Sequence, residues 1–376
     1  MPLTVATIVG TRPEIIKLSC VIAALDRATR HVLIHTGQNF DYELNQIFFD
    51  GLGIRPPDHF LDAAGTNAVD TIASVLRRID PVLAKESPDA VLILGDTNSC
   101  LGVLAAKRRK IPVFHMEAGN RSFDERVPEE INRRIIDHIS DINMPYSEHA
   151  RRYLLDEGIR PETIIKTGSP MKQVLHVQRD SIAASSALQK QGVSAGSYFI
   201  VSAHREENVD DPVRFDRLLA ALRRIAERYR MPVVVSTHPR TRKRLESHGA
   251  GAMPDAVRFL KPLAFADYIS LQSQSKCVLS DSGTITEEAS ILGFPAVMLR
   301  EAHERPEGMD EGTLIMCGTN PDLILDAIET TLARRVKGGG RPHIVADYDV
   351  DDVASKVVNT IYSYTDYVNR VIWRKP

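Results

Sequence analysis

The 376-residue chain has almost no net charge, no long apolar run and few cysteines. Its 47 Lys and Arg residues nearly balance its 49 Asp and Glu residues, so nothing attracts it generally to nucleic acid or an anionic membrane. No apolar run reaches the roughly 20 residues that a membrane span requires. The first residues, MPLTVATIVGTRPE, lack a basic segment followed by a long apolar core, so we expect a cytoplasmic protein.

Cysteine spacing and glycine spacing exclude two further classes of site. The four cysteines, Cys20, Cys100, Cys277 and Cys317, are far apart and form no C-x-x-C pair. We therefore expect them to be reduced and mostly buried, and we expect no zinc site. No G-x-G-x-x-G follows any expected strand, so the chain lacks the fingerprint of a nicotinamide dinucleotide loop, and we expect no cofactor.

What the sequence does contain is a regular alternation of short apolar runs and amphipathic stretches. The runs are continuous rather than alternating, as in parallel strands that are buried on both faces. Helical patterns between them predict an α/β protein with doubly wound parallel sheets. The expected strands are 3–9, 31–35, 90–94, 112–116, 197–203, 232–238, 277–280 and 296–299.

The chain is long enough for two domains, and the alternation is interrupted near Gly168-Ser169-Pro170. We place one Rossmann-like domain at 1–170 and a second at 171–352. The segment 353–376 has apolar residues at helical spacing and is expected to return to the first domain as a helix. A ligand would then bind in the cleft between the domains, at the carboxyl ends of the strands.

The first strand is followed by GTRPEIIKL, which places two basic residues at a strand-to-helix turn. Pro13 suits the first position of a helix, and Arg12 lies directly before it, at the start of that helix. Lys17 follows about one turn later. The pair is interpreted as an anion clamp, the alternative being a solvated basic pair on an exposed turn.

Acidic residues follow the next strands of the first half. Asp96 comes directly after a strand and a glycine, where it is either a helix N-cap or a functional acid. Glu117 ends an apolar strand, so partial burial would raise its pKa and suit it to general acid–base chemistry. Glu129 and Glu130 follow Pro128 at a helix start, and one of the two is expected to join the other acids while the other favours the helix dipole.

In the second half, His204 ends a strand and is the histidine best placed for a cleft. Further along, Arg300 and Arg305 occupy a long polar loop that follows a strand. Such loops often carry function in parallel-sheet proteins.

The stretch VLSDSGTITEEASILG predicts an anion site, because a strand, a small-residue turn and a helix start follow one another from Val278. Thr284 and Glu287 have the spacing of a capping box, which explains Glu287 as a structural residue. Glu288 points about 100° away around the helix and suits the hydroxyl groups of a ribose. An anion site beside a carboxylate that accepts hydrogen bonds from ribose hydroxyls indicates a nucleoside diphosphate.

Taken in order, GTRPEIIK, GDTNS, MEAGNR, PEEINR, AHREEN, SDSGTITEE and RPEG resemble the non-hydrolysing UDP-N-acetylglucosamine 2-epimerase family. The resemblance extends from about Thr7 to about Gly312 and implies a GT-B fold, in which UDP lies between two Rossmann-like domains. It implies inversion of C2 in a UDP-2-acetamido sugar by elimination of UDP to a 2-acetamidoglycal and re-addition. It also implies a homodimer.

The resemblance assigns roles to particular residues. It implies that the catalytic residues are Asp96, Glu117, the acid at Glu129 or Glu130, and His204. It implies that UDP or the sugar contacts Arg12, Lys17, Ser282, Gly283, Thr284, Glu288 and Arg305. No metal ligand is implied.

Several motifs depart from the pattern of members that act on UDP-N-acetylglucosamine. Those members typically carry DSGG, EAGLR and GHRRE, where this chain has DSGT, EAGNR and AHREE. The present motifs look most like the branch that converts UDP-2-acetamido-2,6-dideoxy-L-talose to UDP-N-acetyl-L-fucosamine for capsule or O-antigen. We expect that substrate, with UDP-N-acetylglucosamine as the alternative.

Three other functions share some of these features. A GT-B glycosyltransferase has the same fold and UDP site but needs an acceptor groove and usually has fewer acids. A UDP-sugar binding protein gains nothing from several carboxylates near a diphosphate, because they weaken binding of an anion. A hydrolysing epimerase would release the free sugar.

Overall fold

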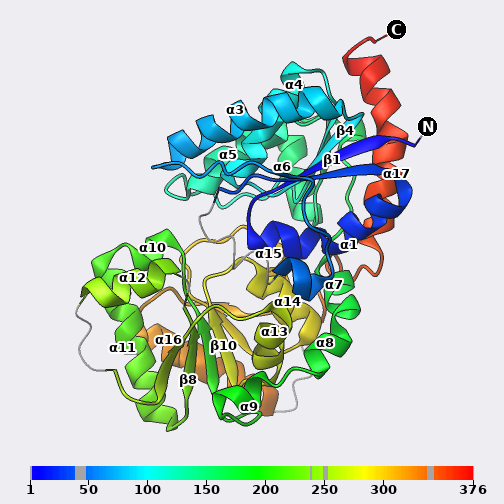
Figure 1. Ribbon diagram of the computed structural model, residues 1–376. Helices are drawn as coiled ribbons and strands as arrows, with labels where there is room; N and C mark the ends of the chain where they lie inside the picture. Colours follow the sequence, from blue (N-terminus) through cyan, green and yellow to red (C-terminus); the bar gives the residue numbers. More distant parts are fainter. Residues whose placement is uncertain (1, 39–47, 238, 249–252, 337–342, 376) are drawn as a thin grey trace. The chain divides into compact units, whose positions relative to one another are not determined.

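The computed structural model describes residues 2–38, 48–237, 239–248, 253–336 and 343–375, and it forms two compact units (Figure 1). The first unit comprises Met1–Val177 and Ala346–Pro376, and the second comprises Gln178–Val345. The sequence places the boundaries at 170 and 352. Helix α7 (Met171–Val177) lies in the first unit because it packs against α1 (Arg12–Ala28).

Each unit contains a six-stranded parallel sheet within the described residues. In the first unit the strand order is β3-β2-β1-β4-β5-β6, so the direction of winding reverses between β1 and β4. Such a reversal is the usual place for a ligand in a doubly wound sheet. The strands are β1 (Thr4–Val9), β2 (Arg30–His35), β3 (His59–Phe60), β4 (Ala90–Leu94), β5 (Val113–Met116) and β6 (Ile142–Met144).

Helices connect these strands and cover the sheet. Besides α1 and α7, they are α3 (Ala68–Glu86), η1 (Asn98–Gly102), α4 (Val103–Arg108), α5 (Pro128–Ile139), α6 (Glu148–Asp156), η2 (Pro161–Thr163), α17 (Val353–Tyr367) and η3 (Val368–Ile372). Helix α17 packs against α1, and the Tyr362 hydroxyl donates to the carbonyl oxygen of Ala28 at 2.5 Å. The C-terminal segment therefore belongs to the first unit.

The second unit repeats the topology of the first. Its order is β12-β11-β10-β7-β8-β9, with the reversal between β7 and β10. The strands are β7 (Phe199–Ser202), β8 (Val233–Ser236), β9 (Val257–Leu260), β10 (Cys277–Ser280), β11 (Ala296–Met298) and β12 (Ile315–Met316). The helices are α8 (Arg179–Ala183), α9 (Ala187–Gln191), α10 (Glu206–Val209), α11 (Pro212–Tyr229), α12 (Pro239–His248), α13 (Phe265–Gln274), α14 (Thr284–Leu292), α15 (Pro306–Asp310) and α16 (Pro321–Val336).

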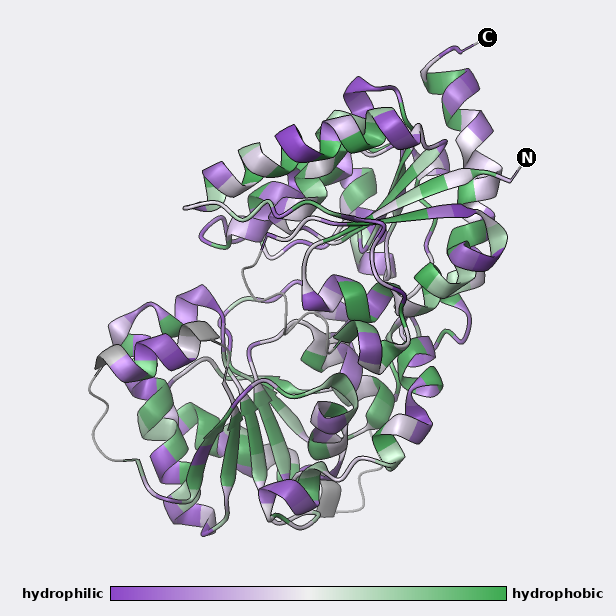
Figure 2. Ribbon diagram, viewed as in Figure 1, coloured by the Kyte–Doolittle hydropathy of each residue, from purple (hydrophilic) through white to green (hydrophobic). Residues whose placement is uncertain are grey.

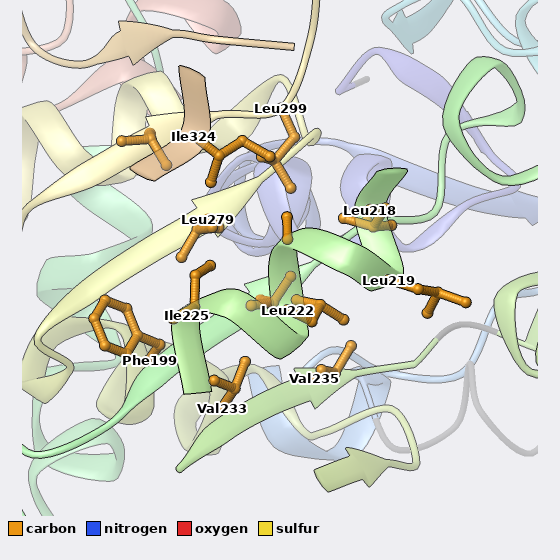
Figure 3. Close-up of a cluster of buried hydrophobic side chains, with 14 of the residues drawn as sticks. Phe199, Leu218, Leu219, Leu222, Ile225, Val233, Val235, Leu279, Leu299 and Ile324 are labelled. Carbon is orange, nitrogen blue, oxygen red and sulfur yellow. The ribbon is translucent and has the colours of Figure 1, made fainter. Parts of the chain in front are cut away.

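The core of the second unit shows why its sequence folds this way. Helix α11 places Leu218, Leu222 and Ile225 at helical spacing against apolar side chains of the sheet, among them Phe199 and Val233 (Figure 3). All of these side chains are almost fully buried. Figure 2 shows the same division, with apolar strands in the interior of the unit and polar residues on the outward faces of the helices. Burial of these side chains is the main source of stability for the unit.

These sheets confirm the predicted fold class of two doubly wound parallel sheets. Every one of the eight strands expected from apolar runs is present, with ends that differ by a few residues. The strands that the sequence did not predict are β3, β6, β9 and β12, and all four lie at sheet edges.

Two other expectations from composition concern the cysteines and membrane spans. All four cysteines are free, with Cys100 and Cys277 buried and Cys20 and Cys317 half-buried. Among the described helices, none combines the length and the apolar character needed to cross a bilayer.

Candidate functional site

The residues singled out from the sequence follow the strands on either side of each reversal. In the first unit, Arg12 follows β1, Asp96 follows β4 and Glu117 follows the neighbouring strand β5. In the second unit, His204 follows β7 and Ser282 follows β10. Parallel strands end at one edge of a sheet, so each unit gathers its candidate residues at one edge.

In the first unit, Arg133 joins two of the candidate acids. Its Nη2 lies 2.6 Å from Oδ2 of Asp96, and its Nη1 lies 3.0 Å from Oε2 of Glu130. Glu130 is fully buried and also accepts hydrogen bonds from the backbone N–H and the hydroxyl of Ser122. Acids held by a shared guanidinium have fixed positions, which suits proton transfer.

Glu117 lies at the same edge of the sheet, directly after β5, the neighbour of β4. Its backbone has a φ of +62°, the left-handed region that side chains other than glycine rarely adopt. Its Oε2 lies 2.6 Å from Nζ of Lys17, which is buried and also lies 5.3 Å from the centre of the Tyr146 ring. This contact fixes the position of the carboxyl group beside the end of β5. We call Asp96, Glu117 and Glu130 the acid cluster.

The structure separates residues that the sequence treated as pairs. Lys17 is buried against Glu117, so the alternative of a solvated basic pair is wrong for Lys17. Arg12 is half-buried, with its guanidinium carbon 5.5 Å from the centre of the Phe48 ring. Of the two adjacent glutamates, Glu130 contacts Arg133 from a buried position, whereas Glu129 is half-buried.

A buried carboxyl group that the sequence analysis missed connects the turns after β1 and β4. Glu14 accepts hydrogen bonds from the backbone N–H groups of Gly10 and Thr11, at 2.5 and 2.8 Å. Its other oxygen accepts from the hydroxyl of Thr97, directly after Asp96, and from the thiol of Cys100. Burial raises the pKa of Glu14 to about 7, although these hydrogen bonds lower it in part.

In the second unit, Asp281 has the corresponding role. This fully buried residue after β10 accepts hydrogen bonds from the backbone N–H groups of His204 and Arg205, each at 3.0 Å, and from the amide of Asn208 at 3.1 Å. Its Oδ1 also lies 3.2 Å from Nδ1 of His204. The imidazole of His204, which is 39% exposed, is therefore oriented by a buried carboxylate.

The structure corrects the interpretation of Glu287 as a capping-box residue. Helix α14 begins at Thr284 with Gly283 as its N-cap, and no side chain caps it. Glu287 is buried instead, with Oε2 at 3.1 Å from Nη2 of Arg305. Nε of the same Arg305 donates to the carbonyl oxygen of Gly283 at 2.9 Å. The carboxylate of Glu287 therefore pairs with a buried cation instead of capping the helix, and the pair holds Arg305 at the start of α14.

Glu288 and the hydroxyl groups of the turn have separate partners. Glu288 is nearly buried and accepts a hydrogen bond at 2.9 Å from the amide of Gln272, on α13. The hydroxyl groups of Ser282 and Thr284 lie 3.0 Å apart. The turn after β10 therefore carries two neighbouring hydroxyl groups, whereas the carboxylate of Glu288 is buried against α13.

Simple signals in the sequence could have found the missed residues. Thr11 and Glu14 have the S/T-x-x-E spacing that was noticed only at Thr284. Arg133 lies three residues after Glu130 on a predicted helix, so both share one face. Asp281 is the acid directly after a strand. Among the described residues, no group of three or more His, Cys, Asp and Glu side chains is arranged to hold a metal ion.

Comparison with known proteins adds a family to this geometry. The model of the UDP-N-acetylglucosamine 2-epimerase family matches residues 23–362. The chain is 36% identical to the UDP-2,3-diacetamido-2,3-dideoxy-D-glucuronate 2-epimerase of Pseudomonas aeruginosa, over 90% of this chain and 94% of that protein.

Solved structures agree with this result. A UDP-N-acetylglucosamine 2-epimerase from Rickettsia bellii has a TM-score of 0.92 and 50% identity, over the whole of both chains. The Methanocaldococcus jannaschii UDP-GlcNAc 2-epimerase, solved with UDP-GlcNAc and UDP, has a TM-score of 0.87 and 32% identity over 96% of this chain and 100% of that one. The predicted GT-B fold is confirmed by these similarities.

The burial of Glu14 predicts how stability depends on pH. The folded chain keeps the proton on Glu14 up to about pH 7, whereas an ordinary carboxyl group releases it near 4.5. The stability that Glu14 contributes is thus fully present below the unfolded pKa and is lost as pH rises through the folded pKa. Glu14→Gln mimics the protonated form, so its unfolding free energy relative to wild type should rise between pH 5 and 8 by on the order of 3 kcal/mol.

Urea unfolding of both chains at several pH values measures this difference. Glu227→Gln, on the exposed face of α11, is the matched control and should follow wild type at every pH. Parallel stability curves for wild type and Glu14→Gln would contradict the assigned pKa.

Proposed function

Because the chain belongs to the UDP-N-acetylglucosamine 2-epimerase family, we propose that it inverts C2 of a UDP-2-acetamido sugar without hydrolysing it. The observation that carries this proposal is the acid cluster, in which Asp96, Glu117 and Glu130 come together at one edge of the first sheet, held by Arg133 and Lys17. A protein that only bound an anion would gain nothing from such a cluster.

The proposed reaction follows from the weak acidity of the C2 hydrogen, which is not adjacent to a carbonyl group. A base removes the C2 proton while the bond from C1 to the diphosphate oxygen breaks. The C–H electron pair becomes the C1–C2 double bond of a 2-acetamidoglycal, and UDP leaves with the C1–O electron pair. In the second step, UDP adds back to C1 and an acid delivers a proton to the other face of C2. No electrons are gained or lost overall.

Removal and delivery of a proton on opposite faces of C2 need at least two groups. The acid cluster supplies carboxyl groups from three different segments, the turns after β4 and β5 and the helix α5. Glu117, held by Lys17 and with its side chain 13% exposed, is assigned to this proton transfer together with Asp96 and Glu130. His204, oriented by Asp281, is assigned to the reacting sugar or its phosphates by the resemblance.

The second unit is assigned to the leaving group. The turn that begins α14, with Ser282, Gly283 and Thr284, supports diphosphate binding because backbone N–H groups at a helix start attract anions. Arg305 is assigned to neutralise the charge of the same diphosphate, and Glu288 is assigned to bind the ribose hydroxyls. In the first unit, Arg12 and Lys17 are assigned to UDP or the sugar by resemblance, although Lys17 also contacts Glu117.

The finer substrate assignment is UDP-2-acetamido-2,6-dideoxy-L-talose, with UDP-N-acetylglucosamine as the alternative. Overall identity does not separate such substrates. Relatives named as UDP-N-acetylglucosamine 2-epimerases include proteins that are 31% and 50% identical to the chain, and the relative named for a diacetamido glucuronate, at 36%, lies between them. The assignment is supported by the motifs DSGT, EAGNR and AHREE.

The resemblance also supports a homodimer that acts in the cytoplasm on precursors of capsule or O-antigen.

Solvent exchange tests the reaction directly. The enzyme incubated in D₂O with a UDP-2-acetamido sugar should place deuterium at C2, because the proton removed is replaced from a group that exchanges with solvent. Proton NMR follows the loss of the C2 signal. A glycosyltransferase or a binding protein would leave that hydrogen in place, and a hydrolysing enzyme would release the free sugar.

The acid cluster should matter for turnover more than for binding. Glu117→Gln and Asp96→Asn keep the shape of each side chain but remove its proton-transfer chemistry, so kcat should fall by about 10²–10⁴-fold. The affinity for UDP, measured by calorimetry, should stay within about threefold of wild type. Equal losses of turnover and UDP affinity would reassign these residues to binding.

A substrate panel tests the finer assignment. The enzyme is given UDP-N-acetylglucosamine and the 6-deoxy-L-talo sugar in separate reactions, and NMR measures the rate of C2 inversion in each. We expect the larger kcat/KM with the 6-deoxy-L-talo sugar, by about tenfold or more, since a few altered contacts change substrate preference to this extent. A larger value with UDP-N-acetylglucosamine would support the alternative.

A further inference from the structure

Beneath the acid cluster lies a buried polar group that the proposed reaction does not use. It consists of His115 on β5, Asp137 on α5 and Arg121, and we call it the buried triad. Each of the three residues is at most 1% exposed. Polar and charged side chains are rarely buried this completely unless they are paired, so each contact of the triad has structural meaning.

His115 connects the triad to the turn that carries Asp96. Its Nε2 lies 2.8 Å from the carbonyl oxygen of Gly95, the residue before Asp96. A carbonyl oxygen can only accept, so Nε2 carries a proton. Its Nδ1 lies 3.0 Å from Oδ1 of Asp137. The imidazole thus lies between two acceptors that belong to different segments of the chain.

Asp137 connects the triad to the turn that carries Glu117. Its two oxygens lie 3.1 and 3.2 Å from the backbone nitrogen of Gly119, which donates to them. Gly119 has a φ of +81°, and a Cβ at this position would lie 2.4 Å from the carbonyl oxygen of Ala150. The backbone two residues after Glu117 is therefore fixed by Asp137 on one side and by close packing on the other.

Arg121 and α5 complete the connections. Nη1 of Arg121 donates to Oδ2 of Asp137 at 2.7 Å and to the backbone oxygen of Asn120 at 2.7 Å. Asp137 also lies on α5, the helix that carries Glu130 and Arg133. Burial raises the pKa of Asp137, but contact with His115 and Arg121 outweighs that effect and leaves the pKa below its usual range.

The triad therefore touches every segment that supplies a member of the acid cluster. It holds Gly95 before Asp96, Gly119 after Glu117, and the helix of Glu130. Two of these acids retain some exposure, since the side chains of Asp96 and Glu117 are 21% and 13% exposed. The two turns are joined where they begin, because the backbone N–H of Gly95 donates to the carbonyl oxygen of Met116 at 3.0 Å. The path from Gly95 through His115 and Asp137 to Gly119 adds a second connection, which reaches beyond Glu117.

We propose that His115 and Asp137 are positioning residues, which set the spacing of the three carboxyl groups for proton transfer at C2. This inference rests on the proposed epimerase function. A loss of spacing of about 1 Å between reacting groups is enough to slow a reaction about a hundredfold without weakening substrate binding. A residue that only stabilised the fold would show no such selective effect.

The test compares His115→Phe with a matched variant of the same sheet. His31 on β2 is also a buried histidine, with its side chain 1% exposed and Nδ1 at 2.6 Å from Asp26. It lies near the amino end of its strand. The hydrogen bonds that the structure describes for its ring go to Asp26 and Thr7, and neither residue belongs to the three segments that carry the acid cluster. His31→Phe therefore reproduces the loss of a buried histidine side chain that contacts a carboxylate, away from the cluster.

Rates of C2 deuterium incorporation, kcat, KM and UDP affinity are measured for each chain, with unfolding followed by circular dichroism. We expect His115→Phe to lower kcat about a hundredfold, with KM and UDP affinity within about threefold of wild type. His31→Phe should keep kcat within about threefold of the wild-type value, even where its stability falls as much as that of His115→Phe. His115→Gln retains an N–H donor for Gly95 and should recover much of the lost rate.

His115→Gln and Asp137→Asn keep the test decisive if His115→Phe does not fold. Asp137→Asn should lower kcat selectively, because an amide lacks the charge that pairs with Arg121. A folded His115 or Asp137 variant with the kcat of His31→Phe overturns the inference, as does an equal fall in kcat and UDP affinity. A wild-type chain that exchanges no C2 hydrogen overturns the proposed function first, and the inference with it.

Discussion

Buried carboxylates that accept N–H groups from neighbouring strand ends determine the geometry of both candidate sites. Backbone N–H groups beyond the end of a strand have no partner in the sheet and must be satisfied otherwise. Glu14 provides that partner for the turn after β1 and connects it to Thr97 after β4. Asp281 does the same for the turns after β10 and β7. Both bridge the strands at which the winding of their sheet reverses.

This arrangement makes ligand-binding turns rigid without regular secondary structure. A carboxylate that accepts several N–H groups is strongly held, and its charge is compensated by those donors. The side chains on the same turns, such as Asp96 and His204, therefore project from fixed backbone. The energy of burying the carboxyl group is visible at Glu14, whose pKa rises to about 7. The turn is maintained although the ionised form of this residue is disfavoured.

The interior of the fold could be predicted from the sequence, and its edges could not. Central strands such as β4 and β10 are buried on both faces, so their apolar runs are unbroken and recognisable. The edge strands β3 and β12 have two residues each, and β9 is only half-buried along most of its length. Short strands with little burial leave no periodic signal. Their place is determined by pairing with a neighbouring strand, which is tertiary information.

The same limit applies to the candidate site. Position after a strand was enough to select Asp96, Glu117 and His204, because parallel strands end together. It could not select the partner of each residue. Lys17 and Glu117 are a hundred residues apart in sequence and meet only because β5 lies beside β4, which lies beside β1. His115 lies within an apolar strand, where the sequence gives no sign that its ring joins two turns.

The pair formed by Glu287 and Arg305 explains why the proposed anion site in the second unit contains acidic residues. Desolvating two charges is costly, and a buried ion pair often stabilises a fold no more than apolar residues would. What the pair provides is position: Arg305 is bound both to the carboxylate of Glu287 and to the carbonyl oxygen of Gly283. A long flexible cation is thereby fixed beside the helix start before any ligand arrives, so binding a diphosphate there orders fewer side chains. Glu287 acts through Arg305, whereas Glu288, one residue later, is held by Gln272 on a different helix.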